Sequence, residues 1–482
     1  MLQEGNPYAF HKKLALVLGP ILLLFFLIAS PNQNLKLDAV YGCALLMILW
    51  WVAEVVPIYI TAMLPMFLFP ALGIFTVKET FIPYANPIIF LFLGGFIIAL
   101  AMEERNLHTR IALGIIRLTG TDPKGIILGF MLATSFLSMW ISNTATTVMM
   151  LPIALSVVQL LKHQEVDQKL FSSFSLSLLL SIAYSANIGG TITLIGTPPN
   201  VVLAGLFEEK LGIEIGFGDW MLLGLPTGIV LLAACYFLIT RVLIKVNLAK
   251  IKGSSDLFES KRKQLGKMNK AEKLVLTAFL TTALLWCFRG NINAWVGFAL
   301  LHNTSIAMFG GFLMFTIPVN LNKGEFLLHW KSTQKLPWGI LILFGGGLCL
   351  ANAFESVGII ASLGSWVEAN FSYSTAGLIL GLTLLSIFAT EIMSNVALVT
   401  VLLPVVITIG AALNIPFYQI CVPVTLAASC AFMMPISTPP NAVIYSSGLV
   451  PIHKMVKVGV VLNVIAGLVL SFLVPWLASI VF

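Results

Sequence analysis

The sequence predicts an all-α membrane protein with eleven transmembrane helices and two re-entrant hairpins, arranged as two repeats of opposite orientation. Three observations predict this fold. Of the 482 residues, 59% are hydrophobic and only 10% are charged, whereas soluble domains carry about 25% charged residues. Apolar stretches close to the roughly 20 residues of a bilayer crossing recur along the chain. Three short motifs also occur twice, in the same order.

Apolar windows place the crossings. The first follows His11, Lys12 and Lys13; this start can imitate a signal peptide, and we interpret it as a retained first span. Two further apolar regions, 125–161 and 375–412, are interrupted at their centres by Ser-Asn. Each arm has about 16 residues, short for a crossing, so a re-entrant hairpin is favoured over a pair of full spans. The predicted spans are 14–30, 39–57, 60–75, 87–104, 171–208, 219–246, 273–288, 295–319, 338–354, 414–450 and 456–480.

Positive charge predicts which side of the membrane each loop faces, because cytoplasmic loops are enriched in Lys and Arg. With the N-terminus inside, six crossings return the chain to the cytoplasm at 247–273, which is rich in lysine. No Lys or Arg lies between Lys335 and Lys454, so the second hairpin is expected to open outside. Eleven crossings of the inner (plasma) membrane then leave the C-terminus outside. The basic residues of this loop are Lys250, Lys252, Lys261, Arg262, Lys263, Lys267, Lys270 and Lys273.

The repeated motifs indicate two related halves. Ser142–Ile153 reads SNTATTVMMLPI, and Ser394–Val405 reads SNVALVTVLLPV. Five predicted crossings separate these elements, and because five is odd, the second copy must be inverted. Inverted repeats that meet near mid-membrane are typical of secondary transporters. The other repeated pairs are FLGG at 92–95 with LFGG at 343–346, and IGTPPN at 195–200 with ISTPPN at 436–441.

These motifs offer polar groups inside the membrane. A hairpin tip leaves backbone N–H and C=O groups unpaired, and the helix that follows it has an N-terminus suited to an anion. In TPPN, two prolines break the helix, so Thr197 and Thr438 lie on unwound backbone whose carbonyls suit a cation such as Na⁺. Two copies suit an anion with a carboxylate at each end. Since neither motif contains Lys or Arg, co-bound cations and helix N-termini must balance its charge.

Structural roles compete with these functional ones. Ser, Thr and Asn often join transmembrane helices by hydrogen bonds, and a double proline is often only a kink; duplication at matching places favours a site. Glu54 and Glu391 are intramembrane carboxylates that could carry protons or serve structure. The segment Glu103–Leu118 is interpreted as an interfacial amphipathic helix. The six cysteines lie singly, which indicates packing and predicts neither disulfides nor a metal site.

Paired SNT and SNV elements, each followed by TPPN, resemble the divalent anion:sodium symporter family, the INDY-like sodium/dicarboxylate transporters. The resemblance covers nearly the whole chain. It implies a homodimer in membrane lipid, each protomer combining a scaffold with a transport domain that moves as an elevator. By position it places sodium ions on Ser138, Ser142, Asn143 and Gly196, and on Thr390, Met393, Asn395 and Ser437. It places substrate carboxylates on Asn143, Thr144 and Thr197, and on Asn395, Val396, Thr438 and Pro439.

The domains expected on this basis alternate between scaffold and transport elements. Val396 stands where a second SNT motif would have threonine. The missing hydroxyl puts the choice of substrate in question more than the position of the site. The expected units are the N-terminal spans 1–86, largely scaffold; first transport elements 87–218, with hairpin 125–161 and broken helix 171–208; scaffold spans 219–336; second transport elements 337–450, with hairpin 375–412 and broken helix 414–450; and the C-terminal span 451–482.

The leading interpretation is sodium-coupled uptake of C4 dicarboxylates such as succinate, malate or fumarate, with no covalent chemistry and no cofactor besides the coupling ion. A dicarboxylate exchanger, or a proton-coupled, citrate-preferring or sulfate-preferring relative, would share the fold. A channel is disfavoured because crossed hairpins suit occlusion. The sequence shows no catalytic triad, metal cluster or P-loop, which argues against an enzyme or a primary pump. Its cations form no continuous face for nucleic acid.

Overall fold

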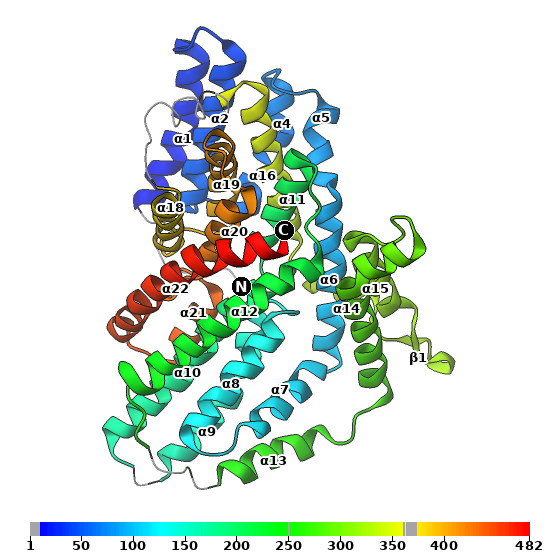
Figure 1. The fold of residues 1–482 in the computed structure, drawn as a ribbon, viewed down its shortest axis with the longest axis vertical. Coiled ribbons are helices and arrows are strands. Elements are labelled where there is room, and N and C mark those ends of the chain that lie inside the picture. Colours follow the sequence, from blue (N-terminus) through cyan, green and yellow to red (C-terminus); the bar gives the residue numbers. More distant parts are fainter. Residues whose placement is uncertain (1–9, 165, 249–250, 252, 360–361, 363–373) are drawn as a thin grey trace.

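The chain folds as a bundle of helices with different tilts (Figure 1). A computed structural model describes residues 10–164, 166–248, 251, 253–359, 362 and 374–482. Lys250 and Lys252, assigned above to a cytoplasmic loop, lie outside the described residues. Ten helices in the described part are long and apolar enough to cross a bilayer. The prediction of an all-α, multi-pass membrane protein is therefore confirmed, while the count of eleven crossings stays a prediction.

The first half of the chain contains the first copy of each motif. Its helices are α1 (Phe10–Ala29), α2 (Leu35–Ala53), α3 (Ile58–Thr61), α4 (Leu64–Ala71), α5 (Val77–Phe81), η1 (Ile82–Ala85), α6 (Pro87–Glu104), α7 (Leu107–Leu118), α8 (Pro123–Ser138), α9 (Asn143–Lys162), α10 (Gln168–Ile192), α11 (Pro198–Leu211), α12 (Phe217–Phe237) and η2 (Leu238–Val242).

The second half contains the second copies and one short hairpin of strands. Strands β1 and β2 are antiparallel, with Pro318 opposite Phe326. The elements are α13 (Ser254–Leu265), α14 (Lys270–Val296), α15 (Asn303–Thr316), β1 (Pro318–Asn320), η3 (Leu321–Lys323), β2 (Glu325–Phe326), η4 (Trp330–Lys335), α16 (Trp338–Ser356), α18 (Thr375–Ala389), α19 (Asn395–Ala412), α20 (Phe417–Ala428), α21 (Pro439–Tyr445) and α22 (Ile452–Val481).

Two predicted boundaries in the second half and the N-terminal region are wrong. The expected break between 288 and 295 is absent, because α14 continues through Asn293, whose side chain instead bonds both backbone groups of Leu301. The turn comes at Gly297, which has a φ of +84° that favours glycine. The expected span 60–75 is divided into α3 and α4, and Pro65 lies in the first turn of α4, where a proline is tolerated.

The predicted amphipathic segment Glu103–Leu118 also needs a correction. Glu103 and Glu104 are the last residues of α6, and α7 begins only at Leu107. Asn106 separates the two helices in a left-handed conformation with a φ of 56°. Within α7, Leu107, Ala112, Leu113 and Ile116 are buried. The amphipathic helix is therefore present, and it is shorter than expected because the chain turns at Asn106.

Both Ser-Asn regions form helix–turn–helix pairs. The turn between α8 and α9 spans 139–142, and that between α18 and α19 spans 390–394. Both arms of each pair pack against the next long helix, α8 and α9 against α10, and α18 and α19 against α20. The predicted interruptions at Ser-Asn are confirmed. That the pairs re-enter the membrane from one side stays a prediction.

The packing of the two halves follows one pattern. Helix α10 contacts α12 as α20 contacts α22, and α9 contacts α21 as α19 contacts α11. Each Gly-Gly pair also has one glycine at a close backbone contact, although at different positions of the pair: a Cβ on Gly94 would lie 2.4 Å from backbone of Ala307 in α15, and one on Gly346 would lie 2.4 Å from the Ala62 carbonyl after α3. These glycines allow close helix approach, which is a packing role rather than a binding role.

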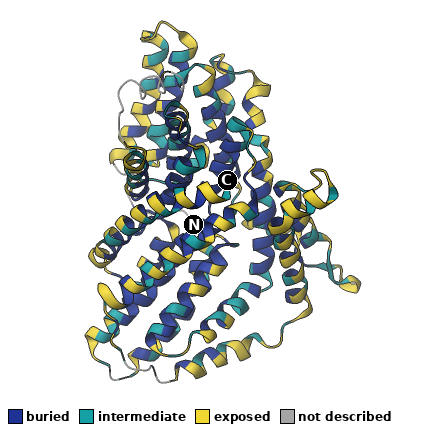
Figure 2. Ribbon diagram, viewed as in Figure 1, coloured by how far each residue is buried: buried dark blue, intermediate teal, exposed yellow. Residues whose placement is uncertain are grey.

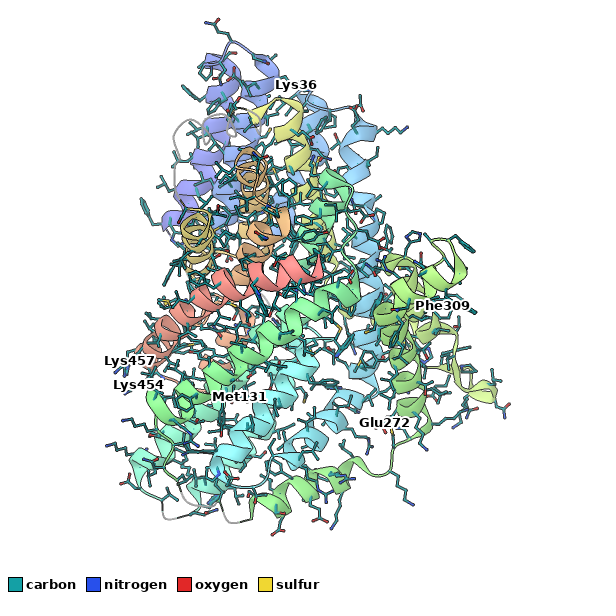
Figure 3. All side chains as sticks on the ribbon, viewed as in Figure 1. Lys36, Met131, Glu272, Phe309, Lys454 and Lys457 are labelled. Atoms are coloured by element: carbon teal, nitrogen blue, oxygen red, sulfur yellow. The ribbon has the colours of Figure 1, made fainter. Side chains whose placement is uncertain are left out.

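Contacts divide the bundle into two groups. The site helices, α8–α12 and α18–α22, pack around α10 and α20. The flanking helices, α1–α6 and α14–α16, make their main contacts with one another, above all α1 with α2 and α6 with α15. Figure 2 shows buried residues between the helices and exposed residues on their outer faces. In Figure 3, Lys36 lies near the upper end of the molecule and Glu272 at its lower right; the sides of the membrane stay a prediction.

Candidate functional site

A cavity of about 1410 Å³ lies where the two halves meet, and all four repeated polar motifs line it. The first hairpin contributes its SNT tip, and the second contributes its SNV tip. Both TPPN breaks face the same space. The structure thus brings together residues from four separate segments of the chain. The motif residues at the cavity are Ser142, Asn143, Thr144, Gly196, Thr197, Pro198, Pro199, Ser394, Asn395, Val396, Ser437, Thr438, Pro439 and Pro440.

The cavity extends to segments that positive charge assigns to the cytoplasmic side. His11 and Lys12 at the start of α1, Glu103 at the end of α6 and Lys335 before α16 all line it. These residues come from three segments that the predicted topology places inside. Lys335 donates to Glu104 Oε1 at 2.8 Å, and this hydrogen bond raises the pKa of the lysine. At this end of the cavity the charge of Lys335 is therefore balanced by the Glu104 carboxylate.

Buried oxygen atoms without partners surround the first hairpin tip. Ser138 Oγ and Asn143 Oδ1 are buried and accept or donate no hydrogen bond within the described part of the chain. Asn143 lies against Gly190, where a Cβ would be 2.6 Å from its Oδ1. Gly196 is close by, since a Cβ there would be 2.5 Å from the Gly190 carbonyl oxygen. Oxygen-only groups of this kind suit a hard cation.

The first tip also begins a helix with its N–H groups toward the cavity. Ser142 Oγ accepts the Ala145 N–H at 3.2 Å and so caps α9. The remaining free N–H groups of the first turn favour negative charge. Thr144 is exposed at this tip. The tip therefore presents donors to an anion beside acceptors for a cation.

Three oxygen atoms converge at the second hairpin. Thr390 Oγ1 lies 2.7 Å from Asn395 Oδ1 and 2.7 Å from the Ala428 carbonyl oxygen. A hydroxyl has one proton, so it can fully satisfy only one of these acceptors. The other acceptor oxygen is available to a cation. Ser437 and Met393 line the same cavity, and Ser437 Oγ donates to the Met434 carbonyl at 2.6 Å.

Each helix break is held by the asparagine of its TPPN motif. Asn200 Nδ2 donates to the carbonyls of Gly190 and Thr193, at 3.3 and 2.8 Å. Asn441 Nδ2 donates to those of Ala431 and Met434, at 3.0 and 3.1 Å. Both asparagines are fully buried. Sequence reasoning used TPPN only as a helix break and missed this role, although the asparagine is part of the repeated motif.

Comparison with known proteins decides the family. Residues 10–482 match the family model described as "Sodium:sulfate symporter transmembrane region". The chain belongs to this family. It is 40% identical to the sodium-dependent dicarboxylate transporter SdcS of Staphylococcus saprophyticus, over 98% of this chain and 93% of that protein. It is 39% identical to SdcS of Staphylococcus aureus strain RF122, over 99% and 94%. The resemblance stated from the motifs is confirmed, and membership of a transporter family also confirms that the chain is not an enzyme.

Two solved structures share the fold of this symporter-family chain. One is Neisseria gonorrhoeae MtrF, whose title describes antimetabolite efflux pumps, with a TM-score of 0.55 and 16% identity over 83% of each chain. The other is the Alcanivorax borkumensis YdaH transporter, with a TM-score of 0.55 and 12% identity, covering 83% of this chain and 87% of that one. At these identities they show a similar fold only.

The two intramembrane carboxylates differ sharply in this family member. Glu391 is buried and accepts four hydrogen bonds, from the backbone N–H groups of Phe432, Met433 and Met434 and from Asn463 Nδ2, at 2.7 to 3.0 Å. It holds the second helix break, which favours the structural role. Glu54 is exposed, lines the cavity mouth and has a left-handed φ of 46°. Among the described residues, the Glu54 carboxylate does not hold a backbone segment in place as the Glu391 carboxylate does.

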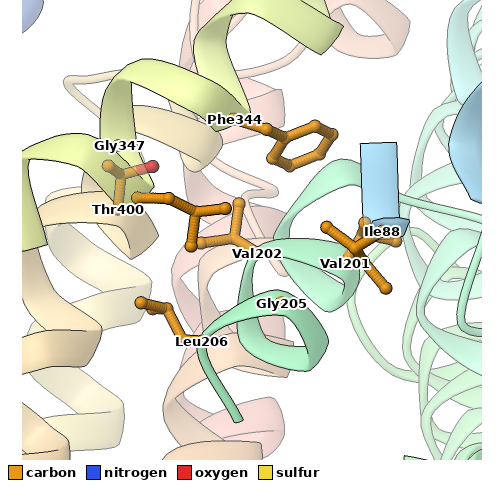
Figure 4. A pocket seen from close by; sticks show the side chains of 9 residues that line it. Ile88, Val201, Val202, Gly205, Leu206, Phe344, Gly347 and Thr400 are labelled. Carbon is orange, nitrogen blue, oxygen red and sulfur yellow. The ribbon is translucent and has the colours of Figure 1, made fainter. Parts of the chain in front are cut away.

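Two smaller cavities lie in the described part of the chain. One measures about 270 Å³ and is lined by Glu208, Glu214 and His302 among others, and its two carboxylates disfavour a dianion. The pocket in Figure 4 measures about 10 Å³ and is lined by apolar groups of α6, α11, α16 and α19, with Thr400 at one wall. It is too small for a dicarboxylate. No group of three His, Cys, Asp or Glu residues in the described ranges could hold a metal ion. Roles of individual motif residues in binding remain predictions.

Proposed function

We propose that this chain is a sodium-coupled carrier of C4 dicarboxylates, such as succinate, malate or fumarate, in the plasma membrane. The observation that carries the proposal is the meeting of two repeated polar motif sets at one cavity. Each set has oxygen atoms that, among the described residues, lack hydrogen-bond partners or compete for one proton. The names of the SdcS relatives, as sodium-dependent dicarboxylate transporters, point the same way.

Charge supports coupling to sodium. The motif residues at the cavity include no Lys or Arg, and the cationic side chains that line it, Lys12 and Lys335, belong to its mouth. A dianion at the motifs therefore depends on the N-termini of α9 and α19 and on cations bound beside it. Two sodium ions next to two carboxylates would make ion and substrate binding mutually favourable.

The sodium ions are proposed at the two oxygen clusters. The first would use Ser138, Ser142, Asn143 and Gly196, and the second Thr390, Met393, Asn395 and Ser437. Orphaned Ser138 Oγ and Asn143 Oδ1 support the first site. The shared proton of Thr390 supports the second. The carboxylates are proposed on Asn143, Thr144 and Thr197 at one end and Asn395, Val396, Thr438 and Pro439 at the other.

The arrangement of charged groups supports an inward-facing state with a closed outer side. Lys210 at the end of α11 pairs with Glu355 at the end of α16, and Glu209 accepts a hydrogen bond from Asn352 of α16. Asn86, before α6, also donates to Glu209 at 3.4 Å. These contacts join a site helix to flanking helices on the predicted outside. We refer to Asn86, Glu209, Lys210, Asn352 and Glu355 as the outer cluster.

The two helix groups suit an elevator in which the site helices move against the flanking helices. The junction in Figure 4 is apolar, so there α11 and α19 could slide along α6 and α16; the polar contacts that must separate are those of the outer cluster. Within this proposal α12 moves with the site helices, since it packs mainly against α10 and α22. That differs from the expected scaffold unit 219–336, and α22 of the C-terminal unit 451–482 joins the moving part for the same reason.

The test is counterflow and uptake of labelled succinate in proteoliposomes, with and without an inward sodium gradient. We expect sodium-dependent uptake by the wild type and at least tenfold loss in Asn143→Ala and Asn395→Ala. Asn291→Ala, at an exposed position of α14, is the matched control and should transport normally. Uptake that ignores sodium, or that responds only to protons, citrate or sulfate, would replace the proposal with one of its relatives. Exchange without net uptake would indicate an exchanger.

A further inference from the structure

Asn187 reaches from the first repeat into the substrate half-site of the second. It lies on α10, is 1% exposed and lines the cavity. Its Nδ2 donates to the Ala431 carbonyl oxygen at 3.1 Å and to Thr438 Oγ1 at 3.2 Å. A carbonyl oxygen can only accept, so the side-chain atom that faces Ala431 must be the amide nitrogen. The same nitrogen faces Thr438, which makes Asn187 a donor to that hydroxyl.

Thr438 Oγ1 accepts a second hydrogen bond from the backbone. The Asn441 N–H donates to it at 3.3 Å, because Thr438 caps α21. A threonine hydroxyl has two acceptor lone pairs and one proton. With both lone pairs engaged by N–H groups, the proton is the only hydrogen-bonding capacity that Thr438 has left. Thr438 is therefore a donor only.

Thr197, the matching residue of the first repeat, lacks this arrangement. Its side chain makes no capping bond to α11. Its hydroxyl lies 3.5 Å from Ser429 Oγ, and either of those two atoms could donate. Thr144 adds a further hydroxyl at the same end of the cavity, whereas Val396 supplies none at the other. The threonine hydroxyl of the first half-site can thus donate or accept, and that of the second is limited to donating.

We propose that Asn187 is a positioning residue that commits the Thr438 hydroxyl to donate to one carboxylate of the substrate. The inference rests on the proposed function, in which Thr438 contacts substrate. It predicts unequal ends: the second half-site requires an ionised carboxylate, while the first also accepts a group that carries protons. A monoamide such as succinamate then binds in one orientation, with its carboxylate at Asn395 and Thr438 and its amide at Thr144 and Thr197.

The test is a double-mutant cycle on KM for succinate in proteoliposomes. Asn187→Leu and Thr438→Val should each raise KM about tenfold, the size expected for a hydrogen bond to a charged group, with Vmax within about threefold. The double variant should be no worse than either single variant, because both remove the same interaction. Asn187→Leu combined with Thr197→Val is the matched control, and those effects should multiply.

Competition by succinamate supplies a second readout that a purely structural role would not move. Thr438→Val should weaken succinate and succinamate by the same factor, whereas Thr197→Val should change the ratio between them. If Asn187→Leu does not fold, Asn187→Asp takes its place, because it removes the same N–H donors at nearly unchanged volume. The ratio between the affinities for succinate and succinamate is measured in either case. Multiplicative effects of Asn187→Leu and Thr438→Val, or an unequal loss of the two ligands in Thr438→Val, would overturn the inference. A wild type that transports no dicarboxylate would instead overturn the proposed function.

Discussion

Asn200 and Asn441 make the same pair of hydrogen bonds at the same offsets along the chain. Each side-chain amide donates to the carbonyl ten residues before it and to the carbonyl seven residues before it. The two asparagines belong to separate copies of the repeated motif, and they close the two helix breaks in one way. Since each break presents backbone to the cavity, these amides set the shape of both halves of the site.

Replacing either asparagine should destabilise the protein and impair transport. Asn200→Leu leaves the carbonyls of Gly190 and Thr193 without this donor, and a lost hydrogen bond of this kind costs about 1–3 kcal/mol. We expect a lower thermal unfolding midpoint in detergent and at least tenfold slower uptake, with Asn441→Leu similar. The exposed Asn291→Ala should leave both quantities unchanged. Normal uptake by Asn200→Leu would show that the break does not need its amide.

Gly190→Ala should weaken sodium binding more than it affects folding. The new methyl group would lie 2.6 Å from Asn143 Oδ1, so the amide must move. Because that oxygen belongs to the proposed first sodium site, we expect the sodium concentration for half-maximal uptake to rise at least fivefold. The matched control is Gly114→Ala in α7, where a Cβ would meet nothing within 4 Å. That change should be neutral or stabilise by up to about 1 kcal/mol. Equal sodium dependence in the two variants would contradict the prediction.

Glu391→Gln should act through folding rather than through proton coupling. The carboxylate accepts four hydrogen bonds, and an amide would turn an N–H₂ group toward donors. Mismatches of this kind cost about 2–4 kcal/mol, which should appear as a clearly lower unfolding midpoint. Residual uptake should keep the pH profile of the wild type. Glu54→Gln, at the exposed cavity mouth, should fold normally. A stable Glu391→Gln protein with an altered pH profile would restore the proton-carrier hypothesis.

Breaking the outer cluster should shift the carrier toward its outward-facing state. Lys210 is largely buried and Glu355 is mostly exposed, so their pair is expected to contribute about 0.5–1 kcal/mol after solvent screening. Lys210→Gln should then raise the outward-facing population about two- to fivefold, measured by spin-label distances between α11 and α16. Lys263→Gln, in an exposed pair with Glu259 on α13, is the control. An unchanged distance distribution in Lys210→Gln would remove the cluster from the gate.

Most of the helices and the two related motif sets could be predicted because hydropathy and motif order are properties of short segments. The misplaced boundaries have local physical causes. Asn106 and Gly297 turn the chain in left-handed conformations, and the polar run near Arg289 stays helical because Arg289 pairs with Glu214 and Asn293 with Leu301. Those partners lie in other segments or across a turn. A hydropathy window does not contain them.

The sequence by itself determined the membrane class, the order of helices and the presence of two related polar motif sets, because bilayer burial and backbone breaks depend on residue type and local order. Only the tertiary structure decided which atoms face one another. It paired Asn187 with Thr438, gave Glu391 a structural set of donors and left Asn143 Oδ1 without a partner among the residues that the structure describes. The reason is geometric: hydrogen bonds act over about 3 Å, and contacts between residues hundreds of positions apart exist only once both repeats have packed.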